Sequence, residues 1–257
     1  MQSENMKYFQ SINARDRVAS DPYFKVKLIV GIIAFLYIVN LFQMGTASAV
    51  SAMAEYLIMI PVIFFSLTFH EFSHALMADF LGDPTPRKLG RLSMNPLKHI
   101  DWIGAIMLFV ANFGWAKPVP VNPGNFRMPA RAMMSVSAAG PISNLLLAVI
   151  GGGIIKLCIT LQPQLSPFTI EMGLFLGKTI LIMNLSLAFF NMIPIAPLDG
   201  SHIMNYFLPA RIKMKLSFLN EMGSFLLIFL VMFGVVGIIL KPLVTFGYRI
   251  ILSLYGF

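Results

Sequence analysis

The residues with the clearest chemical potential form one short motif, His70-Glu71-Phe72-Ser73-His74. His70 and His74 stand four positions apart, so on a helix both imidazoles lie on one face and can reach the same metal ion. Glu71 lies about 100° around the helix from His70, where a general base that activates water is needed. The motif therefore predicts the centre of a metal-dependent hydrolase. The alternative is that these side chains only make hydrogen bonds between helices.

A catalytic zinc ion takes three protein ligands and keeps one position open, so a third ligand is expected elsewhere. The candidate is Asp199, which follows Pro194 and Pro197. These prolines are expected to end the preceding helix, so that the aspartate projects from an unwound end. An ordinary aspartate at a helix exit is the alternative. Charge balance favours the ligand, because Zn²⁺ with Asp199 and Glu71 makes a neutral site, and we expect one Zn²⁺ per chain.

The segments that carry these residues are strongly apolar. Of the 257 residues, 57% are hydrophobic and 12% are charged, with a mean hydropathy of +0.78. A soluble domain is about a quarter charged, so this composition predicts an all-α polytopic membrane protein. The net charge of +8 does not indicate nucleic-acid binding, because the basic residues stand at the ends of apolar segments. A single cysteine, Cys158, excludes intramolecular disulfides and cysteine zinc clusters.

About six transmembrane helices are expected, since a segment of about 20 apolar residues crosses the hydrocarbon core as a helix. They are predicted at 27–44, 56–81, 131–158, 172–193, 221–240 and, as a shorter segment that either crosses at a tilt or lies in the interface, 242–256. No polar block is long enough for a separate soluble domain, so residues 1–257 are expected to form one membrane-embedded domain.

The 82–130 connection is the one sizeable loop expected between spans. Its second half is expected to be extended, because Pro118, Pro120, Pro123 and Pro129 all lie within it. Close helix packing is expected where small residues cluster, at 138–140, at 151–153, and at Gly234 with Gly237.

The distribution of Lys and Arg predicts the orientation in the membrane. Five precede the first span, seven lie between the second and third, and three follow the fourth, whereas Lys241 is alone on the opposite side. This asymmetry of fifteen to one predicts a cytosolic N-terminus and a cytosolic 82–130 connection. No signal peptide is expected, because about 25 polar residues precede the first apolar run.

Five further motifs occur in a characteristic order after the start of the second span. They are 82–85 (GDPT), 95–101 (NPLKHID), 114–123 (GWAKPVPVNP), 140–144 (GPISN) and 191–200 (NMIPIAPLDG). Together with the zinc motif, they make the chain resemble the site-2 protease family of intramembrane zinc metalloproteases from about residue 56 to 215. Trp102 stands where Pro is expected, far from the zinc residues. The chain lacks PDZ and CBS modules, so it is similar to a minimal member.

The resemblance implies that Glu71 is the base and that His70, His74 and Asp199 bind zinc. It also implies that Asn144 and Asn191 face the active site. For Asn144, the expected catalytic role is to hold the substrate backbone or the oxyanion. The alternative for Asn144 is a polar bond between helices.

Four other polar residues near these motifs are interpreted without a functional role. His99 and His202 are expected to be surface or interface histidines. Asp79 and Asp83 are expected to be solvated residues at the cytosolic end of the second span.

The function expected from the resemblance is zinc-dependent endoproteolysis of the transmembrane segments of other membrane proteins in the cell membrane. The expected partners are a transmembrane protein substrate, the lipid bilayer and a regulatory membrane partner of unknown identity, and no nucleic acid. The extended 114–125 stretch is expected to offer an edge for pairing with an unwound substrate. The alternatives are an intramembrane metal transporter or channel, and a catalytically inactive membrane scaffold.

Overall fold

The computed structural model describes residues 46–105 and 114–257. The expected span at 27–44 lies outside the described residues. The chain divides into two compact units, Met1–Glu55 and Tyr56–Phe257. All side chains discussed below belong to the second unit.

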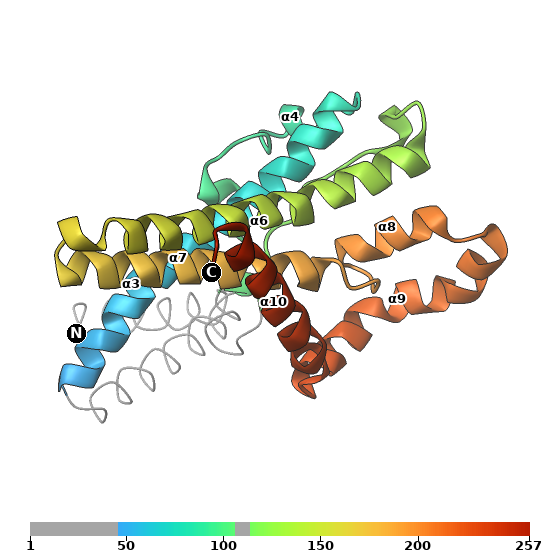
Figure 1. The fold of residues 1–257 in the computed structure, drawn as a ribbon. Coiled ribbons are helices and arrows are strands. Elements are labelled where there is room, and N and C mark those ends of the chain that lie inside the picture. The colour runs from blue at the N-terminus through green and yellow to red at the C-terminus, as the bar shows by residue number, and fades with distance from the viewer. Residues whose placement is uncertain (1–45, 106–113) are drawn as a thin grey trace, which may run out of the picture. The chain divides into compact units, whose positions relative to one another are not determined.

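Long apolar helices dominate this unit (Figure 1). They are α3 (Thr46–Phe80), α6 (Pro129–Thr160), α7 (Pro167–Asn191) and α10 (Val235–Leu254). Four candidate membrane spans follow from length and composition within the described residues: Leu57–Phe80, Pro129–Thr160, Pro167–Asn191 and Val235–Leu254. The first three agree closely with the spans expected at 56–81, 131–158 and 172–193.

The helix boundaries follow from local sequence. Pro129 and Pro167 stand in the first turns of α6 and α7, where a missing N–H costs nothing. Ser166 precedes α7 and its side chain accepts a hydrogen bond from the Thr169 N–H, which caps the helix start. Helix α7 ends at Asn191, before Pro194.

The C-terminal region differs from the expectation. A single span was predicted at 221–240, but α9 (Ala210–Met232) ends and α10 begins at Val235. Between them, Gly234 has a positive φ of 71°, a conformation that glycine adopts without steric cost. The candidate span in this region therefore runs from Val235 to Leu254 and contains most of the segment expected at 242–256. Among the described residues, no atom lies within 4 Å of a Cβ built at Gly234 or Gly237, so the close packing expected at these two glycines is not found there.

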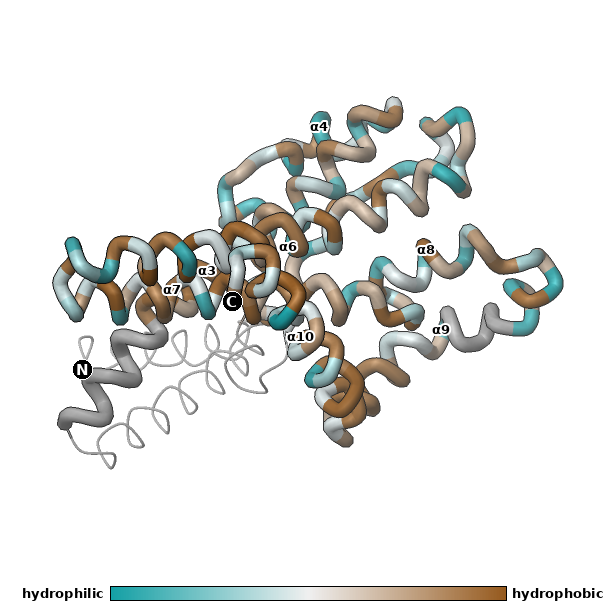
Figure 2. Tube along the Cα trace, viewed as in Figure 1, coloured by the Kyte–Doolittle hydropathy of each residue, from teal (hydrophilic) through white to brown (hydrophobic). Residues whose placement is uncertain are grey.

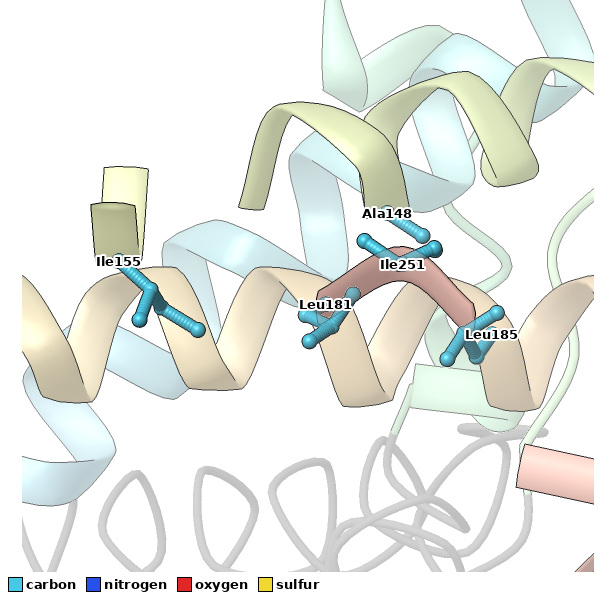
Figure 3. Close-up of a cluster of buried hydrophobic side chains, with 5 residues drawn as sticks. All are labelled: Ala148, Ile155, Leu181, Leu185 and Ile251. Atoms are coloured by element: carbon cyan, nitrogen blue, oxygen red, sulfur yellow. The ribbon is translucent and has the colours of Figure 1, made fainter. Parts of the chain in front are cut away.

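The expected close packing is present at residues 151–153, in the contact between α6 and α7, which run side by side (Figure 1). A Cβ on Gly151 of α6 would lie 2.6 Å from the backbone N of Leu181 and 2.8 Å from the backbone O of Gly177, both in α7. Only a residue without a side chain permits this approach. Beside it, Ala148 and Ile155 of α6, Leu181 and Leu185 of α7, and Ile251 of α10 form a buried cluster (Figure 3).

The connection after α3 contains short helices and extended backbone. The helices include α4 (Thr85–Lys88), η1 (Pro96–Lys98) and η2 (Pro123–Asn125), and residues 102–105 are also helical. Residues 114–122 form no regular element apart from one antiparallel bridge between Ala116 and Ile100. The backbone N–H of Lys117 also donates to the His99 carbonyl at 2.8 Å. The stretch is therefore extended as expected, but it is not part of a sheet in the described residues.

The segment after α7 positions the predicted aspartate. Residues 192–198 are non-helical, and the short helix α8 (Asp199–Phe207) follows. Asp199 is the first residue of this helix rather than part of an unwound end. Figure 2 shows that apolar residues dominate α6, α7 and α10, whereas hydrophilic residues gather near α4 and where α8 turns into α9.

Candidate metal centre

Three side chains from two distant parts of the sequence converge on one point. The Nε2 atoms of His70 and His74 lie 3.0 Å apart. The Oδ2 atom of Asp199 lies 3.3 Å from each of them. Within the described residues, these side chains form a group that could hold a metal ion, and both histidines are buried.

A chain of buried amides determines which nitrogen of His70 carries its proton. The Nδ1 atom of His70 lies 2.6 Å from Oδ1 of Asn144. The Asn144 Nδ2 donates to Oδ1 of Asn184, and the Asn184 Nδ2 donates to the Ser66 hydroxyl and the Ile180 carbonyl. Because Asn144 uses its nitrogen as a donor to Asn184, its oxygen must accept from His70. The His70 proton is therefore on Nδ1, and Nε2 presents a lone pair.

His74 is held in the same tautomer by the backbone. Its Nδ1 lies 2.7 Å from the carbonyl oxygen of Val136, which can only accept. Its Nε2 therefore also presents a lone pair to the centre. A histidine that donates one ring N–H to a carbonyl while the other nitrogen faces a shared point is the usual arrangement of a metal ligand.

The donor set fits a divalent cation. Two imidazole lone pairs and a carboxylate oxygen face one another, and the Asp199 Oδ2 atom is buried without a hydrogen-bond partner. A proton on one histidine would relieve only part of this mutual repulsion, whereas a cation at the centre relieves all of it. Tetrahedral ligands at about 2.0 Å from Zn²⁺ lie about 3.3 Å from one another, which matches the three separations observed here. Two nitrogens and one oxygen also leave a fourth position open.

Gly140 makes room for this arrangement. It lies on α6 opposite the histidines, and a Cβ at this position would lie 2.4 Å from the His74 Nε2 and 2.5 Å from the His70 Cε1. Any other residue would displace the imidazoles. In the motif 140–144, Gly140 thus leaves room for the rings of His70 and His74, and Asn144 orients the ring of His70.

Glu71 lies beside the cluster on the wall of a cavity of about 500 Å³. Its side chain is buried, and Oε2 accepts a hydrogen bond of 3.1 Å from the backbone N–H of Val119. The cavity walls come from α3, α6, α7, α8, α9 and residues 114–121. Hydrophobic side chains, among them Leu67, Leu187 and Phe190, form much of its lining. The Glu71 carboxylate and the three converging atoms thus share one cavity with a largely apolar lining.

The structure brings together most of the predicted site residues and separates one of them from the cavity. His70, Glu71, His74 and Asp199 all line it, and so does Asn191, whose Nδ2 donates to the Leu187 carbonyl. Asn144 is fully buried behind His70, with both amide atoms engaged within the protein.

Sequence analysis missed Asn184, although an asparagine in the middle of an apolar span is itself a signal that a buried partner exists. Its side chain is fully buried and links α7 to Asn144 and Ser66.

Two of the residues interpreted as peripheral are buried instead. Asp83 has no exposed surface, and its carboxylate accepts four hydrogen bonds. His99 is 1% exposed, and its Nε2 lies 2.7 Å from the Ser93 carbonyl. By contrast, Asp79 pairs with the exposed Arg87, and His202 is exposed on the wall of the cavity.

Comparisons of the sequence with known proteins identify a family and two relatives. The family model described as "Peptidase family M50" matches residues 58–234. A Bacillus subtilis protein named "Putative zinc metalloprotease YwhC" is 37% identical over 208 residues, which are 80% of this chain and 93% of that protein. A Mycolicibacterium smegmatis protein named "Putative zinc metalloprotease Rip2" is 32% identical over 161 residues, which are 60% of this chain and 59% of that protein. No solved structure matches.

Proposed function

Because this chain belongs to peptidase family M50, the family of the site-2 proteases, we propose that it is a zinc-dependent endopeptidase that cleaves transmembrane segments of other membrane proteins. The observation that supports this most directly is the convergence of His70 Nε2, His74 Nε2 and Asp199 Oδ2 next to Glu71 in one cavity. We propose these three side chains as the zinc ligands and Glu71 as the general base.

The chain's own residues supply positioning and proton transfer. Bound zinc would supply a Lewis acid that polarises the scissile carbonyl and lowers the pKa of water. Glu71 takes a proton from the attacking water and returns it to the leaving amine, because it is the carboxylate on the cavity wall that is not directed at the three-atom cluster. The N–H of Val119 holds one oxygen of Glu71 in place. The Oε1 atom then remains the oxygen for this proton transfer.

For Asn144 the structure favours the alternative to a direct catalytic role. Its side chain is fully buried, contacts His70 and Asn184, and is not among the residues that line the cavity. We propose that it orients His70 and fixes its tautomer, as the outer hydrogen-bond partners of metal-bound histidines do.

The proposed substrate class follows from the lining and depth of the cavity. Its walls are largely apolar, which suits the side chains of a transmembrane segment. Glu71 lies in the candidate span Leu57–Phe80, so the scissile peptide must reach membrane depth. A helical segment hides its carbonyls in hydrogen bonds and must first unwind, and the extended backbone at 116–122 lies beside Glu71 to receive it.

We propose the membrane orientation from charge, with the N-terminus and the 82–130 connection in the cytosol. Among the described residues, Lys88 is the last residue of α4, Arg91 follows this helix, and Lys117 lies in the extended stretch. Water would reach Glu71 from this side. The proposed location is the cell membrane.

The transporter and scaffold alternatives are less well supported. A metal pathway needs ligands at several depths, whereas the metal-binding group found in residues 46–105 and 114–257 lies at one point. An inactive scaffold has no use for a buried carboxylate beside that group.

The proposal is tested with Glu71→Gln, which preserves the shape of the side chain and removes its basicity. Membranes containing the wild-type or the variant protein are compared by mass spectrometry of transmembrane peptides. Fragments that accumulate with the wild type and are absent with Glu71→Gln support the function. Identical fragments in both would refute it, and metal transport that persists in the variant would favour the transporter.

A further inference from the structure

The backbone that touches Glu71 is not held by a sheet. Residues 117–122 pass helix α3 in an extended conformation, and Val119 donates its N–H to Glu71 of this helix. Pro118 and Pro120 on either side of Val119 have no N–H to donate. In the described residues, the bridge at Ala116 is the one β-type pairing along this stretch. Something other than strand pairing must therefore fix the position of Val119.

A buried carboxylate fixes one end of this stretch. Asp83 lies three residues after the end of α3 and has no exposed surface. Its Oδ2 accepts the backbone N–H of Asn122 at 2.7 Å, across 39 positions of sequence. Its Oδ1 accepts the Asn125 Nδ2 at 2.6 Å, and also the Thr85 hydroxyl at 2.6 Å and backbone N–H at 3.1 Å.

The charge of Asp83 strengthens this attachment. Burial by itself raises the pKa of a carboxyl group, but the hydrogen bonds from Thr85, Asn122 and Asn125 outweigh it and hold the pKa of Asp83 below its usual value. All four bonds are therefore charge-assisted at neutral pH, which makes each shorter and stronger than a neutral one.

A buried guanidinium fixes the other end. Arg91 is 6% exposed, and its Nη2 donates to the carbonyl oxygen of Lys117. The attachments at Lys117 and Asn122 flank Val119 on both sides. Both attachments are made by residues just after α3, Asp83 and Arg91. Helix α3 itself carries Glu71.

We propose that Asp83 is a positioning residue of the proposed peptidase, holding residues 117–122 against α3 so that the Val119 N–H stays on Glu71. This inference rests on the proposed function. It assigns a role in the reaction to a carboxylate that does not touch the substrate. Arg91 assists from the opposite end of the stretch.

The matched pair of variants is Asp83→Asn and Asp79→Asn. Asp79 lies one turn earlier and pairs with the exposed Arg87, and within the described residues it makes no hydrogen bond or ion pair with residues 117–122. In Asp83→Asn, one carboxylate oxygen becomes an NH₂ group that faces protein donors, so at least one attachment is lost. Asn125→Ala removes one donor and leaves the carboxylate intact, which gives a milder third variant.

Each variant is purified in detergent and compared for zinc content, melting temperature, amide hydrogen exchange of the peptide containing Val119, and kcat on a transmembrane reporter that wild type cleaves. For Asp83→Asn we expect faster exchange at Val119 and a loss of about tenfold or more in kcat, because small misplacements of reacting groups are costly. Zinc content should stay at the wild-type level. Asn125→Ala should show smaller changes of the same kind, and Asp79→Asn should match wild type.

Unchanged exchange at Val119 in Asp83→Asn would overturn the inference, as would a loss of activity fully explained by a lower folded fraction. If Asp83→Asn fails to fold, Asn125→Ala tests the inference instead. Wild-type hydrogen exchange at Val119 and wild-type kcat in Asn125→Ala would then overturn the inference. The exchange measurement needs no substrate, so it separates this inference from the proposed function. A wild type that shows no proteolysis at all would contradict the function and leave the exchange result to decide the positioning.

Discussion

The Nδ1 atom of His70 lies 2.6 Å from the Oδ1 atom of Asn144, a contact that joins α3 to α6 across 74 positions of sequence. It belongs to a chain of amides that continues to Asn184 on α7 and returns to Ser66 on α3. His70, Asn144, Asn184 and Ser66 are all buried, and Asn184 also donates to the Ile180 carbonyl of its own helix. The network therefore fixes three helices around the proposed metal centre and leaves the His70 Nε2 free to bind.

Asn144→Ala should weaken zinc binding without removing a ligand. Loss of the acceptor for His70 Nδ1 frees the ring to rotate or to change tautomer, and such outer-partner changes cost about 10–100-fold in metal affinity or activity. Ser143→Ala is the matched control, since its hydroxyl is also buried in α6 but bonds only to the Gly140 carbonyl. Competition with a chromophoric chelator measures both affinities. Equal zinc affinity in Asn144→Ala and Ser143→Ala would contradict the orienting role.

The proposed ligands predict the zinc content of the purified protein. Wild type should carry about one zinc per chain, because three ligands and an open position complete one tetrahedral site. His70→Ala and His74→Ala should lose it, and Asp199→Asn should bind zinc more weakly and cleave little, because the shape is kept but the charge is lost. His202→Ala is the control, as this histidine lines the same cavity outside the metal-binding group. Elemental analysis measures the zinc content of these four variants and of Asp199→Ala. Full zinc retention in Asp199→Ala would assign the third ligand elsewhere.

The sequence predicted the part of the centre that lies within one helix and the family to which the chain belongs. A spacing of four residues on a helix determines that His70 and His74 face the same way, so local geometry was sufficient. The spans predicted at 56–81, 131–158 and 172–193 each coincide with a candidate span, with ends that differ by up to five residues, because hydrocarbon thickness sets their approximate length. Asp199 was named from its proline-rich context, but only tertiary structure brings it to the histidines across 125 positions.

Features that depend on tertiary contacts could not be derived in this way. Gly234 ends a helix within a continuously apolar stretch, and no polar residue marks the break. Asp83 resembles a solvated residue at a helix end because its partners Asn122 and Asn125 lie about 40 positions away. The role of Asn144 depends on Asn184, and no sequence pattern connected this residue in the middle of α7 to the site.

The proposed orientation predicts which positions react from the cytosol. In a Cys158→Ala background, which removes the native thiol, Lys88→Cys and Lys117→Cys should both be protected from membrane-impermeant maleimide in intact cells. Both positions are exposed in the structure, so each should react once the cytosolic face is opened. Labelling of either cysteine from outside intact cells would reverse the orientation.

Gly140→Ala should impair the metal centre even though the same change is neutral or favourable elsewhere in a helix. An alanine Cβ at position 140 would lie 2.4 Å from the His74 Nε2, so the imidazole must move away from the cluster. We expect zinc affinity to fall by about tenfold or more, comparable to the loss of an outer hydrogen-bond partner.

Gly237→Ala is the matched control, because this glycine lies in α10 and no atom of the described residues lies within 4 Å of the new Cβ. There the substitution should keep wild-type zinc affinity and add up to about 1 kcal/mol of stability, since glycine is the poorer helix former. Chelator competition and thermal unfolding of the metal-free proteins measure the two effects. Wild-type zinc affinity in Gly140→Ala would show that the histidines do not need the space that this glycine provides.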